Sequence, residues 1–123
     1  MNKLNNKEAT HLNVLNQYIK DLSYENLQKN SAQNPNVKEN KTSIDIQVIH
    51  ERYDESYFGV ILKITINCKS KKNEAIIFHL ELDYYGFFKA VNAENSDKNE
   101  LITQGAKILF PFARSIIANI TQN

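Results

Sequence analysis

The side chains that could perform catalysis or bind a metal are few in this sequence, and they are scattered. The three histidines, His11, His50 and His79, lie far apart, and none stands at metal-ligand spacing from another or from the single cysteine, Cys68. The chain has three glycines, which excludes a glycine-rich loop for phosphate. Because an enzyme needs several titratable groups that converge on one site, we expect a protein that is not an enzyme and has no metal and no cofactor.

Glu81 and Asp83 come nearest to a catalytic pair of carboxylates, because alternate residues of a strand share one face. Solvated carboxylates on a strand are the interpretation that we favour. Cys68 falls on the inward face of its expected strand, and this position favours a buried thiol over a nucleophile.

Length and composition indicate one domain in a reducing compartment. A chain of 123 residues can bury a modest core. The net charge is +1 and no basic block stands apart, so we expect no nucleic-acid surface, and a solvated hairpin tip explains the cluster of Lys69, Lys71 and Lys72. A single cysteine excludes an intramolecular disulfide. No apolar run reaches the ~20 residues of a membrane span, so we expect a cytoplasmic protein without membrane insertion.

Apolar and polar residues alternate with a period of two in four segments and with a helical period in a fifth. The strands are expected over residues 12–24, 42–51, 58–68 and 76–84, and the helix over residues 106–122. Gly105 is expected to separate this helix from a short turn before it, and Pro111 to start or kink it. We expect a mobile tail over residues 1–10 and a single domain over residues 11–123. Within the domain, we expect a long loop over residues 26–41.

Four successive strands followed by a helix predict the α+β class, with a four-stranded antiparallel sheet and the C-terminal helix packed on one face. In the first strand, alternation places Tyr18 on the same face as Leu12 and Leu22, and Ile19 with Asp21 on the other. The face of the sheet opposite the helix carries an unusual apolar load for a solvent-exposed side, which is typical of a binding site or an oligomer contact. The residues of this load are Ile49, Ile61, Ile77 and Tyr85.

The C-terminal helix presents apolar residues around more than one of its faces. One sheet face cannot cover them all, so we expect a helix–helix contact between subunits and a dimer or tetramer. The residues expected at this contact are Phe110, Phe112, Ile116, Ile117 and Ile120.

Three segments carry a resemblance to a known family. Residues 18–25 have the sequence Y-I-K-D-L-S-Y-E, residues 78–88 have F-H-L-E-L-D-Y-Y-G-F-F, and residues 108–114 have I-L-F-P-F-A-R. In this order and spacing, the segments resemble those of the SecB family of bacterial export chaperones, and the resemblance covers roughly residues 17–122.

The resemblance implies a molecular chaperone that binds unfolded preproteins in apolar surface grooves and delivers them to the SecA translocation motor. It also implies a homotetramer, arranged as a dimer of dimers, that does not itself use ATP. The fold that it implies, a four-stranded antiparallel sheet with helices on one face, is the one that the alternation predicts independently.

By position, the resemblance places the client groove on one strand and the SecA-docking surface on the open face of the sheet. The groove residues are Phe78, Leu80, Leu82 and Tyr84, and the docking residues are Asp21, Glu25, His79 and Glu81. Burial alone favours a core role for the groove set, so we expect Leu80 and Leu82 mostly in the core and Phe78 and Tyr84 mostly at the groove. A solvated face is the equally open alternative for the docking set.

Two departures from the family keep other functions open. Family members usually continue into a connecting loop and a second helix where this chain stops, and they are generally acidic, whereas this chain is near neutrality. The first alternative is a SecB-like chaperone dedicated to one client, such as an antitoxin. The second is an oligomerisation domain that has lost client binding.

Overall fold

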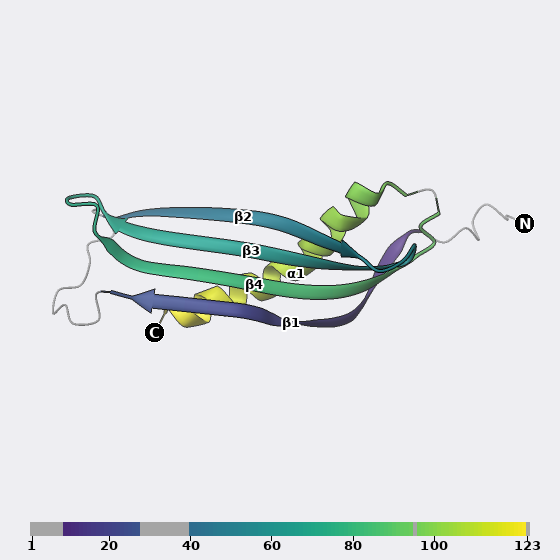
Figure 1. The fold of residues 1–123 in the computed structure, drawn as a ribbon, viewed down its shortest axis with the longest axis horizontal. Helices are drawn as coiled ribbons and strands as arrows, with labels where there is room; N and C mark the ends of the chain where they lie inside the picture. The colour runs from purple at the N-terminus through teal and green to yellow at the C-terminus, as the bar shows by residue number, and fades with distance from the viewer. Residues whose placement is uncertain (1–8, 28–39, 95, 123) are drawn as a thin grey trace, which may run out of the picture.

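The computed structural model describes residues 9–27, 40–94 and 96–122, which form one sheet and one long helix (Figure 1). In chain order the elements are β1 (His11–Asn26), β2 (Asn40–Arg52), β3 (Tyr57–Ser70), β4 (Ile76–Val91) and α1 (Lys98–Thr121). The strand order is β1-β4-β3-β2, and every neighbouring pair is antiparallel. The predicted α+β class is therefore confirmed. The expected mobile tail and the expected long loop lie mostly outside the described residues.

The core lies between α1 and the two central strands, and α1 runs diagonally across one face of the sheet (Figure 1). The strict alternation in β3 supplies its half of this core, because every second side chain points toward α1. The register places Leu62 opposite Tyr84 and Ile64 opposite Leu82, so the apolar rows of β3 and β4 share that face. Cys68 is buried, as expected for a structural thiol.

Two glycines let α1 approach the sheet closely. A Cβ atom on Gly86 would lie 2.6 Å from Cδ2 of Leu109, and a Cβ atom on Gly105 would lie 3.1 Å from Cγ2 of Val60 and 3.2 Å from Cε2 of Phe88. Each glycine therefore makes a notch that a facing side chain fills. Leu109 is fully buried in the first notch.

The helix begins earlier than the sequence predicts. It starts at Lys98, after the N-cap residue Asp97, whose side chain accepts a hydrogen bond from the backbone N–H of Asn99 at 3.1 Å. Gly105 was expected to break the helix, and this expectation is wrong: the missing side chain serves close packing against the sheet. Pro111 lies inside the helix and does not start it.

Strand β1 changes phase twice along its length. Its pairing with β4 shifts by one residue between Val14 and Asn16 and again between Ile19 and Asp21, as β-bulges do. Tyr18 therefore lies opposite Tyr85 on the face away from α1, and Ile19 lies on the face toward α1. The alternation predicted the reverse for both residues, because a period-two pattern does not reveal an inserted residue.

Candidate functional site

The face of β4 toward α1 carries the four residues that were expected to line a groove. Leu80 and Leu82 are 0% exposed and belong to the core, as predicted. Tyr84 was expected to stand mostly at the groove, and this is wrong, since it is buried in the same core. Its hydroxyl donates a hydrogen bond to Oε1 of Gln17 at 2.9 Å, and burial raises the pKa of Tyr84.

Phe78 is the member of this set that remains partly accessible. It is half-buried and packs against the edge of the core, with its ring centroid 5.9 Å from that of Tyr24 on the neighbouring strand. Both aromatic side chains lie toward the end of the sheet where β1 ends and β4 begins. They supply an adaptable apolar wall there.

A further apolar surface lies on the same side of the sheet, and the sequence analysis did not assign it to the site. We call Ile44, Ile46 and Val48 of β2 the apolar strip. These side chains lie on the α1 side, yet Ile44 is 60% exposed and the other two are 45% exposed. The cause is that α1 starts near the Arg52 end of β2 and then crosses β3 and β4 toward β1, so it does not cover the part of β2 that carries the strip. The alternation of apolar and polar residues in β2 is visible in the sequence. It cannot reveal this surface, because a strand covered by a helix has the same alternation.

The sheet face turned away from α1, which we call the open face, brings together the four residues expected for docking. Glu25 lies opposite His79 across the β1–β4 pair, and the Nε2 atom of His79 lies 3.5 Å from Oε2 of Glu81. Asp21 stands further along β1 on the same face, where its register partner is Asp83. We call Asp21, Glu25, His79 and Glu81 the acidic patch.

Asp83 also lies on the open face, but it is ion-paired and so differs from the carboxylates of the acidic patch. Asp83 forms an ion pair with Lys63, whose Nζ lies 3.0 Å from Oδ2 of Asp83. His79 is held by a hydrogen bond between its Nδ1 and Oδ1 of Asn67. Asp21, Glu25 and Glu81 are exposed, so their charges face solvent. Glu81 and Asp83 share a face, as the alternation predicts.

The other half of the open face holds an aromatic cluster that the sequence analysis missed, apart from Tyr85. The ring centroids of Tyr18 and Tyr85 lie 5.0 Å apart, and those of Tyr53 and Phe87 lie 5.1 Å apart. The hydroxyl of Tyr53 contacts that of Tyr85 at 3.1 Å and donates to Oε1 of Glu51 at 2.7 Å. These two hydrogen bonds, the one with Tyr85 first, raise the pKa of Tyr53.

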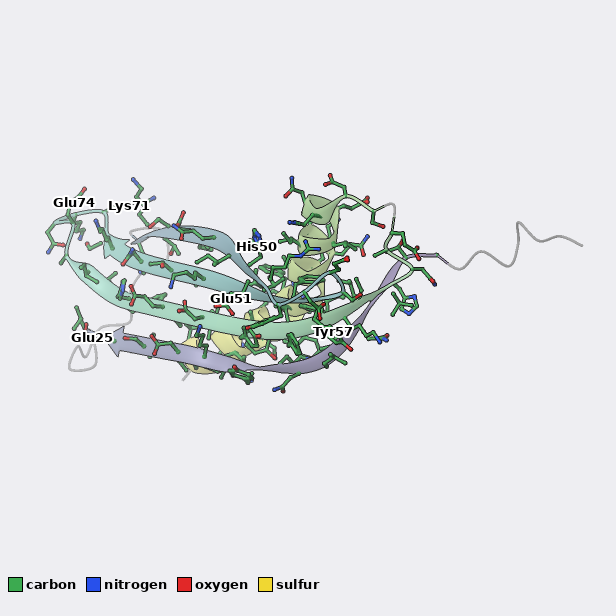
Figure 2. All side chains as sticks on the ribbon, turned by 45° about the vertical axis from the view of Figure 1, so that its right-hand side comes forward. Glu25, His50, Glu51, Tyr57, Lys71 and Glu74 are labelled. Carbon is green, nitrogen blue, oxygen red and sulfur yellow. The ribbon has the colours of Figure 1, made fainter. Side chains whose placement is uncertain are left out.

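The two halves of the open face are well separated along the sheet. Figure 2 shows Glu25 toward one end of the sheet and Tyr57 toward the other. Tyr57 belongs to the aromatic half, where its ring stacks on Phe87 with centroids 6.0 Å apart. Of the apolar load predicted for this face, Ile49, Ile61 and Tyr85 lie side by side in the aromatic half, whereas Ile77 lies two residues from His79, at the end of the acidic patch.

The residues expected at an oligomer contact fall into two groups on α1. Phe110 and Phe112 are 38% and 48% exposed and point away from the core. The three isoleucines of this set are half-buried and pack against the edge of the core. They are Ile116, Ile117 and Ile120. The exposed phenylalanines leave a large apolar area uncovered in a single chain.

The three histidines lie on three different strands. His11 lies on β1, His50 on β2 and His79 on β4. Across the described ranges, no group of three or more His, Cys, Asp or Glu side chains is placed to hold a metal ion. The same part of the chain contains no helix with the length and apolar character that a membrane crossing requires.

Comparisons with known proteins all point to the same family. The family described as preprotein translocase subunit SecB matches residues 5–123 of this chain. The chain is 33% identical over 117 residues to the protein-export protein SecB of Maricaulis maris, covering 94% of this chain and 67% of the relative. It is 37% identical over 116 residues to the protein of that name from Nitrobacter hamburgensis, covering 94% and 72%.

A solved structure shares the fold at much lower identity. A SecB-like chaperone of Mycobacterium tuberculosis, solved in complex with a peptide from an antitoxin, superposes with a TM-score of 0.69 and 10% identity. The match covers 90% of this chain and 81% of that chain. The sheet-and-helix fold, the extent of the family match and the identity to export proteins agree, so the chain belongs to the SecB family of protein-export chaperones.

Proposed function

We propose that this chain binds unfolded preproteins along the apolar strip and at Phe78. The observation that carries the proposal is the exposure of Ile44, Ile46 and Val48 on the side of the sheet that elsewhere forms the core. Burial of apolar surface is non-directional and contributes about 25 cal/mol per Å², so such a surface accepts many sequences.

The position of the apolar strip adds a second means of holding an extended chain. Strand β2 lies at the edge of the sheet, where its outer backbone groups have no strand partner among the described residues. An extended client can pair with such an edge through backbone hydrogen bonds while its side chains lie on the strip. The buried Leu80, Leu82 and Tyr84 support this surface from within the core.

Two isoleucines of β2 test the proposal as a matched pair. Ile46 is 45% exposed on the α1 side, and Ile49 is 40% exposed on the open face. Ile46→Ser is expected to weaken binding of an unfolded, reduced polypeptide about tenfold, which is the loss for one apolar side chain at a contact. Ile49→Ser should leave the affinity unchanged. Fluorescence titration measures both variants, and equal losses, or no binding by the wild type, would refute the proposal.

We further propose that the acidic patch docks the SecA motor and that the chain works in the cytoplasm as a homo-oligomer, a dimer of dimers. The support is that Asp21, Glu25 and Glu81 gather on one exposed face, as expected from the family, although the chain as a whole has a net charge of only +1. A local cluster of one sign steers and orients a basic partner even on a nearly neutral protein.

Charge reversal tests the docking proposal. Glu25→Lys combined with Glu81→Lys is expected to weaken SecA binding about tenfold or more at low salt, because rim charges act through screened attraction. The loss should shrink as salt rises, while the oligomer mass stays constant. The control is Glu55→Lys combined with Glu100→Lys, which changes the net charge equally at exposed positions away from the patch. If both doubles bind SecA alike by surface plasmon resonance, the patch is a solvated face.

A chaperone dedicated to one client is the second candidate. The structural neighbour from Mycobacterium tuberculosis was solved with an antitoxin peptide, which supports this use of the fold. The candidates separate in a competition experiment. A dedicated chaperone binds one partner far more tightly than unrelated unfolded polypeptides, whereas an export chaperone binds many with similar affinity.

A further inference from the structure

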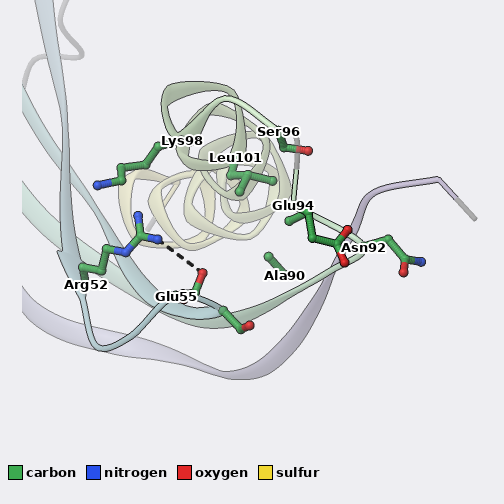
Figure 3. Close-up of a pocket in the computed structure, with 10 residues that line it drawn as sticks. Arg52, Glu55, Ala90, Asn92, Glu94, Ser96, Lys98 and Leu101 are labelled. Carbon is green, nitrogen blue, oxygen red and sulfur yellow. Dashed lines mark hydrogen bonds between the residues drawn. The ribbon is translucent and has the colours of Figure 1, made fainter.

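A cavity of about 490 Å³ opens at the end of the sheet where β2 turns into β3 and β4 leads into α1 (Figure 3). It lies outside the apolar strip and the acidic patch, and its lining comes from two separate parts of the chain, residues 52–56 and 90–101. Small-molecule sites in proteins are typically ~300–1,000 Å³. The size of the cavity therefore suits a ligand of a few residues or fewer.

Arg52 supplies one charged group of the cavity, and the turn after β2 fixes its position. Its Nε donates to the backbone carbonyl of Asp54 at 3.2 Å, and its Nη2 donates to that of Glu55 at 3.3 Å. A guanidinium has five N–H donors, so most of its donors stay available. A guanidinium held in this way is suited to bind a carboxylate.

Lys98 supplies a second cation on the same side of the cavity as Arg52 (Figure 3). Lys98 is the first residue of α1, where the helix dipole adds a positive potential. Among the residues that the structure describes, neither cation takes part in an ion pair. Two cations from distant parts of the sequence thus line one cavity.

The opposite side of the cavity carries a carboxylate. Figure 3 shows Glu94 beside Asn92 and across the opening from Arg52 and Lys98. Apolar side chains, among them Leu101, line the space between the two sides. Glu55 also lines the cavity, on the side of Arg52, so the lining holds two cations and two carboxylates, and Glu94 is the charged residue on the far side.

Hydrogen bonds hold the walls of the cavity in place. The Oγ1 atom of Thr10 donates to the backbone carbonyl of Asn92 at 2.6 Å and lies 3.0 Å from Oγ of Ser96. The backbone N–H of Ala90 donates to the carbonyl of Ser56 at 2.8 Å. A site whose walls are already fixed loses less entropy when a ligand binds.

We propose that this cavity binds a short peptide with free termini, whose carboxylate lies between Arg52 and Lys98 and whose ammonium lies beside Glu94. A simple anion such as phosphate fits less well, because Glu55 and Glu94 also line the cavity and offset its two cations. The site is independent of the proposed chaperone surfaces.

The test uses the full chain labelled with ¹⁵N and titrated with glycine peptides. Triglycine is expected to cause saturable shifts of the backbone amides of Ser56, Asn92 and Ser96. N-acetyl-triglycine and triglycine amide, which each lack one charge, should bind about tenfold more weakly or worse. Shifts that are absent up to high millimolar triglycine, or equal for the blocked peptides, would overturn the proposal.

Single variants check the orientation of the peptide. Arg52→Gln and Lys98→Gln should each weaken triglycine binding about tenfold, while Lys107→Gln, a change on α1 outside this cavity, should not. Glu94→Gln should weaken triglycine binding and strengthen that of N-acetyl-triglycine. If Glu94→Gln strengthens both, the cavity is a plain anion site and the proposal is wrong. Unchanged melting temperatures confirm that the variants are folded.

Discussion

Leu82→Ala is expected to lower the free energy of unfolding by about 2–5 kcal/mol, the range for leucines truncated in a packed core. Leu82 is 0% exposed on the central strand β4, between Ile64 of β3 and Leu22 of β1 in the sheet register. Both neighbours are fixed by backbone ladders, so the surroundings cannot collapse into the space. Urea denaturation followed by circular dichroism measures the loss.

Phe78→Ala is the matched comparison on the same strand and face. Phe78 is half-buried, so its truncation should cost less stability than that of Leu82 and should weaken client binding instead. Phe78→Ala with a stability loss as large as that of Leu82→Ala and normal client affinity would remove Phe78 from the binding surface.

Replacing both exposed phenylalanines of α1 is expected to dissociate the proposed oligomer. Phe110 and Phe112 are 38% and 48% exposed in the single chain, so each has ring surface to bury against another subunit. Burial of a large apolar side chain contributes ~1.5–3 kcal/mol, so Phe110→Ser with Phe112→Ser should weaken association about a hundredfold or more. Light scattering across a concentration series measures the mass.

Lys107→Ser with Arg114→Ser provides the control, since both residues are exposed on the same helix and neither is apolar. This variant should keep the wild-type mass. A wild type that is monomeric at tens of micromolar, or a phenylalanine double variant with unchanged mass, would contradict the expected helix–helix contact.

The sequence predicts β3 well, but it misses the last seven residues of β4 and the start of the helix. β3 is buried on its α1 side along its whole length, so its alternation is strict and its bounds are clear. Gly105 was misjudged because glycine breaks helices in general, whereas here it makes room for Val60 and Phe88. Such a use of glycine depends on the partner surface, and local sequence does not contain that information.

The candidate site was predictable only in part. The acidic patch follows from the resemblance and from alternation, because Glu25 and Glu81 lie on straight stretches of strand between bulges and ends. The apolar strip could not be predicted, because the sequence around Ile46 has the same alternating pattern as that around the buried Ile64, with which Ile46 pairs. Whether a helix covers a strand depends on the angle at which the helix crosses the sheet, and strand periodicity does not encode that angle.

The two glycine notches fix how α1 can move. Gly105 and Leu109 are four residues apart on one helix face, and Leu109 fills the notch at Gly86 while Gly105 admits Val60 and Phe88. A slide of one helical turn, ~5.4 Å, would drive Leu109 into the place of Gly105, where even a Cβ atom is crowded. A slide in this direction is therefore opposed, and a mechanical load that pushes α1 along it is passed to the sheet through these packed contacts.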